Sequence, residues 1–204
     1  KITFLGTGTS SGVPMIGCDC EVCRSADPRD NRLRSSILVQ SPATTLIVDT
    51  GPDFRYQMLR EDVRHLDAVL FTHPHKEALR RDFYYAFADT KYPGLPELNL
   101  HTFDEEPFMV GDIPVQPVTV WHYKMPVSAF RFGAFTYITD ANRLDPEACS
   151  LVRGSSVLVV NALRKEQHLS HFTLEEAVTL VNDLEVPQAY FTHISHQLGL
   201  HAEV

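Results

Sequence analysis

The sequence predicts an α/β fold in which two β-sheets pack between layers of helices. At 204 residues the chain is long enough for one large hydrophobic core, and no linker divides it. The first half is rich in β-prone runs, whereas the second half alternates β-prone runs with helical segments. Two sheets between helices satisfy that order, so residues 1–204 are expected to form one domain.

The N-terminal part is expected to begin with a strand at 1–5, followed by a flexible, glycine-rich loop at 6–12. This loop is not a dinucleotide fingerprint, because its third glycine is misplaced and cysteines and a proline follow where a helix should start. Two further β-prone runs, at 36–39 and 45–48, flank a short turn and predict a hairpin.

Two segments predict helices with identifiable N-caps. Asp53 is a suitable cap for a helix near Phe54 to Arg60. A second helix, from about Thr173 to Leu184, has apolar residues at spacings of three and four and a start with capping-box character. The remaining expected strands are 66–71, 99–101, 113–120, 129–132, 135–139, 157–160 and 188–192.

Composition and charge narrow the functional classes. A hydrophobic share of 44% and a charged share of 22% are typical of a soluble globular protein. No apolar run approaches the roughly 20 residues of a membrane span, and no secretion signal is recognised, so a cytoplasmic location is expected. The net charge of −8 disfavours nucleic acid as a partner. The oligomeric state is left open, with a homodimer among the alternatives.

Metal-binding types of side chain stand at the ends of several β-prone runs. They are His73 and His75, two residues apart after one run, and His122, Asp140 and His193, each after another. A lone His-x-His also occurs on half-exposed strands, but strand ends that repeat the pattern indicate a metal site. Imidazoles with a carboxylate suit zinc, manganese or iron. Asp140 could bridge two divalent ions, with a hydroxide held between them.

Two further side chains admit two interpretations each. Asp49 ends its own strand and could orient a ligand histidine through the ring N–H, but it could equally be a turn-forming residue. His171 lies in a polar, basic loop and could donate a proton to a leaving oxygen, or be only a neighbour of the helix cap at Thr173. The other histidines of this region, His168 included, are expected to be surface or packing residues.

A second metal site is predicted by three clustered cysteines, Cys18, Cys20 and Cys23. In a cytosolic chain such a cluster more often binds metal than forms disulfides. Thiolate-rich tetrahedral zinc sites are structural, because no position is left for water. A fourth ligand is needed, and His196 is preferred over His201.

Taken in order, these motifs resemble the metallo-β-lactamase-fold hydrolases over nearly the whole chain. The segments that carry the resemblance are Phe4-Leu5-Gly6-Thr7-Gly8, Asp49-Thr50-Gly51, Thr72-His73-Pro74-His75, His122, Ile138-Thr139-Asp140 and Thr192-His193. The resemblance implies a four-layer αββα sandwich with two divalent metal ions, zinc or manganese, at one edge of the sheets.

A narrower resemblance comes from the cysteine loop, the loop around His171 and the segment 192–196. These look like the phosphodiesterases that open 5-phosphoribosyl 1,2-cyclic phosphate. By that resemblance His171 is the catalytic histidine, and Asp140 takes part in catalysis while also ligating metal. The implied metal ligands are His73, His75, His122, Asp140 and His193, and the implied structural zinc ligands are Cys18, Cys20, Cys23 and His196.

The sequence departs from the family pattern directly after His75. The family motif His-x-His-x-Asp-His supplies an aspartate and a histidine for the second metal, whereas Lys76 is here followed by Glu77 and Ala78. Glu77 could replace the aspartate, but Ala78 cannot bind a metal. A segment is therefore expected to be missing at this point, with the Cα atoms of Lys76 and Glu77 much further apart than about 3.8 Å.

The sequence as a whole predicts a metal-dependent phosphodiesterase that cleaves a small cyclic or nucleotide-like phosphodiester by metal-hydroxide attack. Fold resemblance alone could not choose this chemistry, and the cysteine loop and His171 decide it. The alternative is a non-catalytic or accessory protein of the same fold that keeps only the structural zinc. Glu77 and Ala78 would favour that alternative if they directly follow Lys76.

Overall fold

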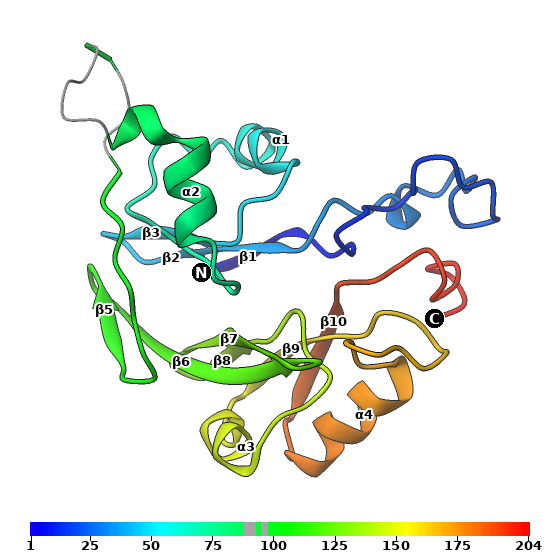
Figure 1. The fold of residues 1–204 in the computed structure, drawn as a ribbon. Coiled ribbons are helices and arrows are strands. Elements are labelled where there is room, and N and C mark those ends of the chain that lie inside the picture. The colour runs from blue at the N-terminus through cyan, green and yellow to red at the C-terminus, as the bar shows by residue number, and fades with distance from the viewer. Residues whose placement is uncertain (88–92, 95–97) are drawn as a thin grey trace.

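The computed structural model describes residues 1–87, 93–94 and 98–204, and within these ranges the strands form two sheets (Figure 1). The first sheet has the order β1-β2-β3-β4 and the second the order β10-β9-β8-β7-β6-β5. The strands of the first sheet are β1 (Ile2–Gly6), β2 (Ser36–Gln40), β3 (Thr45–Val48) and β4 (Ala68–Leu70). Those of the second are β5 (Phe108–Val110), β6 (Ile113–His122), β7 (Met125–Phe132), β8 (Phe135–Tyr137), β9 (Val157–Asn161) and β10 (Gln188–Thr192).

Strand direction brings several carboxyl ends to one edge of the second sheet. β8, β9 and β10 are mutually parallel, and β6 runs the same way as β8 because each is antiparallel to β7. In the first sheet β3 and β4 form a parallel pair. Residues that directly follow these strands therefore share an edge within each sheet, as the sequence pattern requires.

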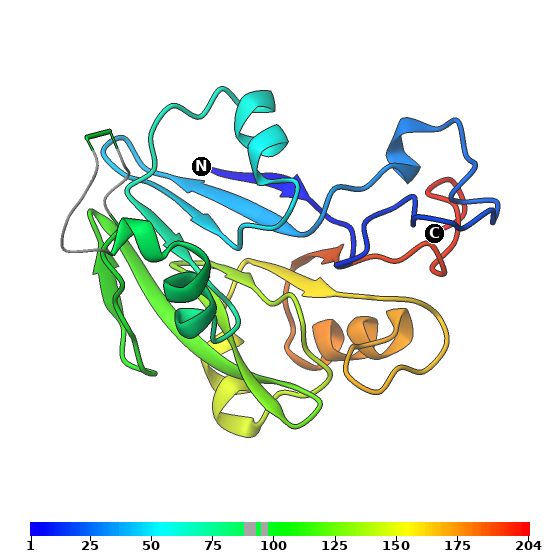
Figure 2. The ribbon, with the colours of Figure 1, turned by 45° about the horizontal axis from the view of Figure 1, so that its top comes forward.

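Helices cover the outer face of each sheet (Figures 1 and 2). α1 (Phe54–Arg60) lies over the first sheet, and α3 (Pro146–Val152) and α4 (Leu174–Asp183) lie under the second. Short 3₁₀ helices occupy Pro28–Asp30 and Tyr84–Ala86. The order helix, sheet, sheet, helix is the four-layer αββα sandwich that the sequence predicted.

Three apolar clusters hold these layers together. The central one lies between the sheets and joins Ile37 and Leu46 of the first sheet to Phe130 and Tyr137 of the second, all fully buried. A second cluster joins the second sheet to α3 and α4, and a third joins the first sheet to α1. Burying a side chain of this size contributes about 1.5–3 kcal/mol, so the two sheets are firmly fixed against each other.

The expected helices agree with the structure, with one difference in capping. The Thr173 hydroxyl accepts from the Glu176 N–H, and the Glu176 side chain accepts from the Thr173 N–H, which completes the predicted capping box of α4. Asp53 precedes α1 as expected but makes no cap hydrogen bond. Its carboxylate instead pairs with Arg34, because the charged guanidinium is the stronger donor.

One strand prediction was wrong, and one strand is longer than predicted. Residues 99–101 are irregular, and the strand before β6 is Phe108–Val110 instead. The segment 99–101 has a single apolar residue, Leu100, and no partner strand in the described residues, whereas 108–110 pair with β6 across a tight turn. β6 itself extends to His122, which pairs with Met125, so His122 ends the strand rather than following it.

The expected wide separation of the Lys76 and Glu77 Cα atoms is not found. α2 (Lys76–Asp82) runs through this point without interruption, and the Leu79 N–H donates to the His75 carbonyl at 2.8 Å. The helix places Glu77 on an exposed first turn. Because Ala78 offers no ligand atom, the family's aspartate and histidine have no full counterpart here.

The glycine-rich segment expected to be flexible instead connects the two sheets. The Thr9 N–H donates to the Ile194 carbonyl at 3.0 Å, and the Ile194 N–H donates to the Thr7 carbonyl at 2.9 Å. A Cβ at Gly6 would lie 2.2 Å from the Arg34 carbonyl oxygen, so only glycine permits this close approach. The segment therefore ties the beginning of the chain to the strand end that carries His193. Among the described helices, none has the length and apolar character needed to cross a bilayer.

Candidate metal centre

Asp140 is the centre of a histidine cluster at the carboxyl ends of the strands. Its Oδ1 lies 2.8 Å from His193 Nδ1 and 3.1 Å from His171 Nε2, and its Oδ2 lies 3.8 Å from His73 Nε2. Asp140, His171 and His193 each offer a ligand atom, and these atoms lie within 4.8 Å of one another. Residues far apart in the sequence thus converge on one carboxylate.

His122 and His75 complete the cluster around His73. The His73 ring centroid lies 5.8 Å from that of His122 and 6.0 Å from that of His75. His122 in turn meets the His171 ring edge-on at 4.8 Å. His75 is exposed at the start of α2 and is the outermost member. Of the five predicted metal ligands, Asp140 and His193 therefore share one convergent group with His171, while His73, His122 and His75 lie around it.

Asp49 acts on this cluster through Thr72, which the sequence analysis did not single out. The Thr72 hydroxyl donates to Asp49 Oδ2 at 2.9 Å and lies 2.7 Å from His73 Nδ1. Because the hydroxyl proton is committed to Asp49, the oxygen accepts the proton on His73 Nδ1. His73 Nε2 is then left unprotonated on the side facing Asp140, as a metal ligand requires. Asp49 thus orients a ligand histidine, though through a hydroxyl rather than directly.

His193 is held by loops from both sheets. Its Nε2 lies 3.0 Å from the Thr9 hydroxyl, and its backbone N–H donates to Ser35 Oγ at 3.1 Å. Thr139 Oγ1 lies 3.5 Å from His193 Nδ1. Thr9 and Thr139, like Thr72, were missed. For Thr72 and Thr139 a usable signal existed, because a threonine directly precedes His73, Asp140 and His193 in the sequence.

The electrostatics of the cluster suit a divalent cation. Burial alone would raise the pKa of Asp140, but His193, His171 and His73 together hold this pKa well below its usual range. Burial lowers the pKa of His73 and of His122, which keeps both imidazoles neutral near pH 7. Neutral imidazoles beside an ionised carboxylate are the donor set that zinc or manganese needs. The residues present therefore fit such an ion.

A cavity of about 180 Å³ opens beside the cluster. Its walls include His73, His75, Asp140 and His193, together with the buried Asp49. Burial raises the pKa of Asp49 to about 6. The metal-binding types of side chain therefore face a space that a small molecule can enter.

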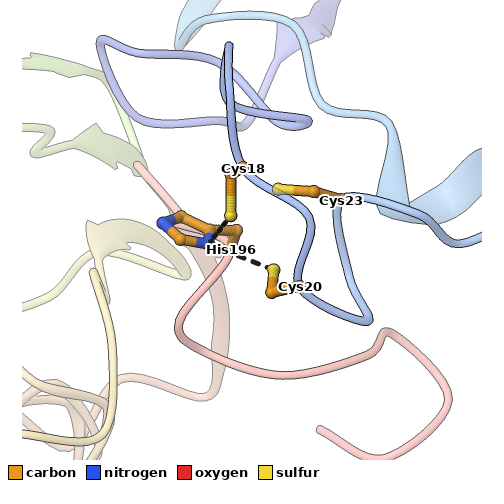
Figure 3. Close-up of side chains that lie close together, drawn as sticks. All are labelled: Cys18, Cys20, Cys23 and His196. Atoms are coloured by element: carbon orange, nitrogen blue, oxygen red, sulfur yellow. Dashed lines mark hydrogen bonds between the residues drawn. The ribbon is translucent and has the colours of Figure 1, made fainter.

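The second predicted site forms where the cysteine loop meets the C-terminal segment (Figure 3). His196 Nδ1 lies 3.4 Å from Cys18 Sγ and 3.3 Å from Cys20 Sγ, and Cys23 completes a group whose ligand atoms lie within 4.8 Å of one another. His201 does not join this group, because its Nδ1 lies 3.3 Å from an Arg32 guanidinium nitrogen. His196 is therefore the histidine that the structure places with the cysteines.

The thiols of this group differ in acidity. A hydrogen bond from the Cys23 backbone, with a further contribution from His196, lowers the pKa of Cys20 to about 6. Burial raises the pKa of Cys23 to about 11. Three thiols and one imidazole converging on one point match the closed tetrahedral set of a structural zinc.

His168 was expected to be an ordinary surface or packing residue, and in the structure it is half-buried and packs against His171. Its Nδ1 lies 3.1 Å from His171 Nδ1, and the two ring centroids are 4.9 Å apart. No periodic pattern in the sequence indicates this contact, because it depends on the local turn of an irregular loop. The ring of His171 joins the cluster, and its loop leads into the α4 cap at Thr173.

Comparison with known proteins gives the family. The description "Beta-lactamase superfamily domain" matches residues 76–194, more than half of the chain, and "Metallo-beta-lactamase superfamily" matches residues 29–75. The chain belongs to the metallo-beta-lactamase superfamily. The two matched ranges meet between His75 and Lys76.

Two solved structures of this superfamily fold are similar to the chain. A structure described as a new diphosphatase from the PhnP family is 33% identical, with a TM-score of 0.91, over 99% of this chain and 89% of that one. The Zn²⁺-bound PqqB from Methylobacterium extorquens is 18% identical, with a TM-score of 0.70, over 95% of this chain and 89% of that one. The second likeness concerns the fold alone.

Two curated relatives are longer than the chain. An octanoyltransferase from Porphyromonas gingivalis is 33% identical over 100% of this chain but only 47% of its own length. A coenzyme PQQ synthesis protein B from Rhodopseudomonas palustris is 32% identical over 36% of this chain and 25% of its own length. The alignment with the first relative extends over 233 positions, more than the 204 residues of the chain.

Proposed function

We propose that this metallo-beta-lactamase superfamily protein is a metal-dependent phosphodiesterase that hydrolyses a small cyclic or nucleotide-like phosphodiester. The observation that carries the proposal is the convergence of His193, His171 and His73 nitrogens on the Asp140 carboxylate. The similarity to a diphosphatase of the PhnP family supports hydrolysis at phosphorus rather than at carbon.

The proposed roles follow from the positions of the side chains. His73, His75, His122, Asp140 and His193 would hold the divalent ions. A bound ion of this kind supplies a Lewis acid and lowers the pKa of water. His171 presents Nε2 toward Asp140, where it can give a proton to the ester oxygen that departs as the P–O bond breaks. A cyclic substrate opens to one phosphomonoester that retains the freed hydroxyl, whereas an acyclic substrate gives a phosphomonoester and an alcohol.

Hydrolysis of bis(p-nitrophenyl) phosphate with added manganese or zinc tests the proposal. His73→Ala removes one ligand and is expected to lower turnover at least about 100-fold, since even losing a group that only supports a ligand costs 10–100-fold. His65→Ala is the matched control, because His65 is exposed and contacts Asp67 instead. Equal turnover in the two variants would refute the metal-dependent mechanism.

An accessory, non-catalytic role is the second candidate. It is favoured by the α2 sequence, in which Glu77 is exposed and Ala78 offers no ligand where the family motif has an aspartate and a histidine. Such a protein would retain zinc at the three cysteines and His196 but would not hydrolyse the test substrate. Elemental analysis separates the two roles, because about one zinc per chain supports a structural site alone.

A further inference from the structure

We propose that His168 is a positioning residue that holds His171 through its ring and thereby aims His171 Nε2 at Asp140. The inference rests on the proposed phosphodiesterase function, in which His171 is the proton donor. It is carried by the hydrogen bonds of a four-residue loop, His168 to His171, that precedes α4.

The first step is that His168 Nδ1 carries no proton. The backbone N–H of Ser170 donates to this nitrogen at 3.3 Å, and a backbone amide is a donor only. His171 Nδ1 lies 3.1 Å from the same nitrogen, and two ring nitrogens at that separation need one proton between them. The proton therefore belongs to His171 Nδ1, which donates to His168, and Ser170 Oγ at 3.0 Å can accept from the same N–H.

The second step concerns the opposite nitrogen of His171. With Nδ1 bound to His168, the opposite nitrogen, Nε2, faces Asp140 Oδ1 at 3.1 Å. The ring is also confined on other sides, because His193 stacks on it at 4.7 Å and His122 meets it edge-on. His168 thus fixes both the ring angle and the nitrogen that delivers the proton, as the third member of a catalytic triad does for its base.

The surroundings of His168 permit chemical rescue. His168 is half-buried and lines a cavity of about 390 Å³ together with Asn142, Gln167, Leu169 and Glu176. Removal of its side chain therefore leaves room that free imidazole can reach from outside. A contact that matters only for packing would not respond to added imidazole.

Three variants separate positioning from packing. In His168→Asn the amide oxygen can take the place of Nδ1 and accept from His171, whereas in His168→Gln it reaches further out, and His168→Ala has no acceptor. The variants are compared on bis(p-nitrophenyl) phosphate, whose leaving group needs little protonation, and on a nucleoside 2′,3′-cyclic phosphate, whose leaving oxygen needs a proton. Metal content is measured for each.

With the cyclic phosphate, His168→Ala and His168→Gln are expected to lower kcat about 10- to 100-fold with little change in KM, since a positioned acid contributes about 10²–10⁴-fold. The loss of kcat should be much smaller with bis(p-nitrophenyl) phosphate. With the cyclic phosphate, His168→Asn should retain most of the wild-type kcat, and added imidazole should restore most of the kcat lost in His168→Ala. Equal kcat values for His168→Ala, His168→Asn and the wild type would overturn the proposal. A lower metal content in His168→Ala would also overturn the proposal, because His168 would then act on the metal site.

Ring nitrogen NMR tests the hydrogen bond independently of activity. In the metal-free protein, two-bond ¹H–¹⁵N spectra are expected to show the proton of His168 on Nε2 and a proton of His171 on Nδ1. A His171 ring with a bare Nδ1 would overturn the inference. If the wild type cleaves neither substrate with manganese or zinc, the proposed function fails, and the NMR result still decides whether His168 holds His171.

Discussion

Individual threonines control the geometry of the candidate centre. Thr72 connects the buried Asp49 to His73, and Thr9 connects the N-terminal loop to His193. Asp49 and His193 both adopt left-handed backbone conformations, with φ of 61° and 57°. Such conformations cost about 1–3 kcal/mol each in residues other than glycine, so the surrounding hydrogen bonds must hold them in place.

Removing the Thr72 hydroxyl tests this control. Thr72→Val keeps the shape of the side chain but breaks the connection from Asp49 to His73, so the His73 ring loses its fixed tautomer. Metal affinity and turnover are expected to fall about 10- to 100-fold. Thr72→Ser, which keeps the hydroxyl, is the control in isothermal titration and in the hydrolysis assay. Equal metal affinities for Thr72→Val and Thr72→Ser would show that the hydroxyl does not orient His73.

The sequence made the ligands easier to predict than the residues that support them. His73, Asp140 and His193 stand at the ends of β-prone runs, and a strand end has a defined place in a sheet. The contact of His168 with His171 and that of Thr9 with His193 join residues through loops. Loop conformation follows no hydrophobic period, so neither contact could be predicted from the sequence.

At the scale of elements, the capped start of α4 positions the loop that carries His171. α4 begins directly after His171 and Phe172, and its capping box fixes where that loop ends. The pattern of Thr173 and Glu176 predicted this helix start correctly, because capping chemistry is local. The strand at 99–101 was wrongly predicted, because strand formation also depends on a distant partner.

Loss of the α4 cap should affect stability more than catalysis. Thr173→Ala removes the acceptor for the Glu176 N–H and is expected to lower the free energy of unfolding by about 1 kcal/mol. Thr173→Ser retains the hydroxyl and serves as the control. Urea unfolding monitored by circular dichroism measures the difference. If Thr173→Ser lost as much unfolding free energy as Thr173→Ala, the stabilisation would come from the buried methyl group rather than from the hydroxyl.

Substitution of Gly6 tests the close approach at the end of β1. In Gly6→Ala the new Cβ would meet the backbone carbonyl of Arg34 at 2.2 Å, and a backbone atom cannot easily move away. The expected cost is at least about 1–3 kcal/mol of unfolding free energy. Gly51→Ala is the comparison, since its nearest neighbours are Arg34 side-chain atoms at 3.7 Å and beyond. Similar urea midpoints for the two variants would contradict the steric argument.

At the scale of the whole molecule, two metal sites with different chemistry are expected. One joins the cysteine loop to the C-terminal segment, and the other lies where strands of both sheets end (Figures 1 and 3). The first connects residues about 180 apart in the chain, so a bound zinc would constrain the unfolded state strongly.

Metal counting tests this division. The proposed hydrolase should hold about two to three metal ions per chain, and His196→Ala should lower the count by one while lowering the melting temperature. His73→Ala should leave the cysteine-bound zinc in place. Elemental analysis with thermal unfolding measures both effects. A wild-type count of about one, unchanged by His73→Ala, would favour the accessory role.

The spacing of His193 and His196 has a thermodynamic consequence. One short turn carries a donor to each site, with His193 facing Asp140 and His196 facing the thiols. An ion bound by the three thiols and His196 would reduce the conformational entropy of that turn. The His193 side chain would then already be ordered when an ion binds beside Asp140. Occupancy of the two sites should therefore be positively cooperative, and by reciprocity each ion would tighten the binding of the other.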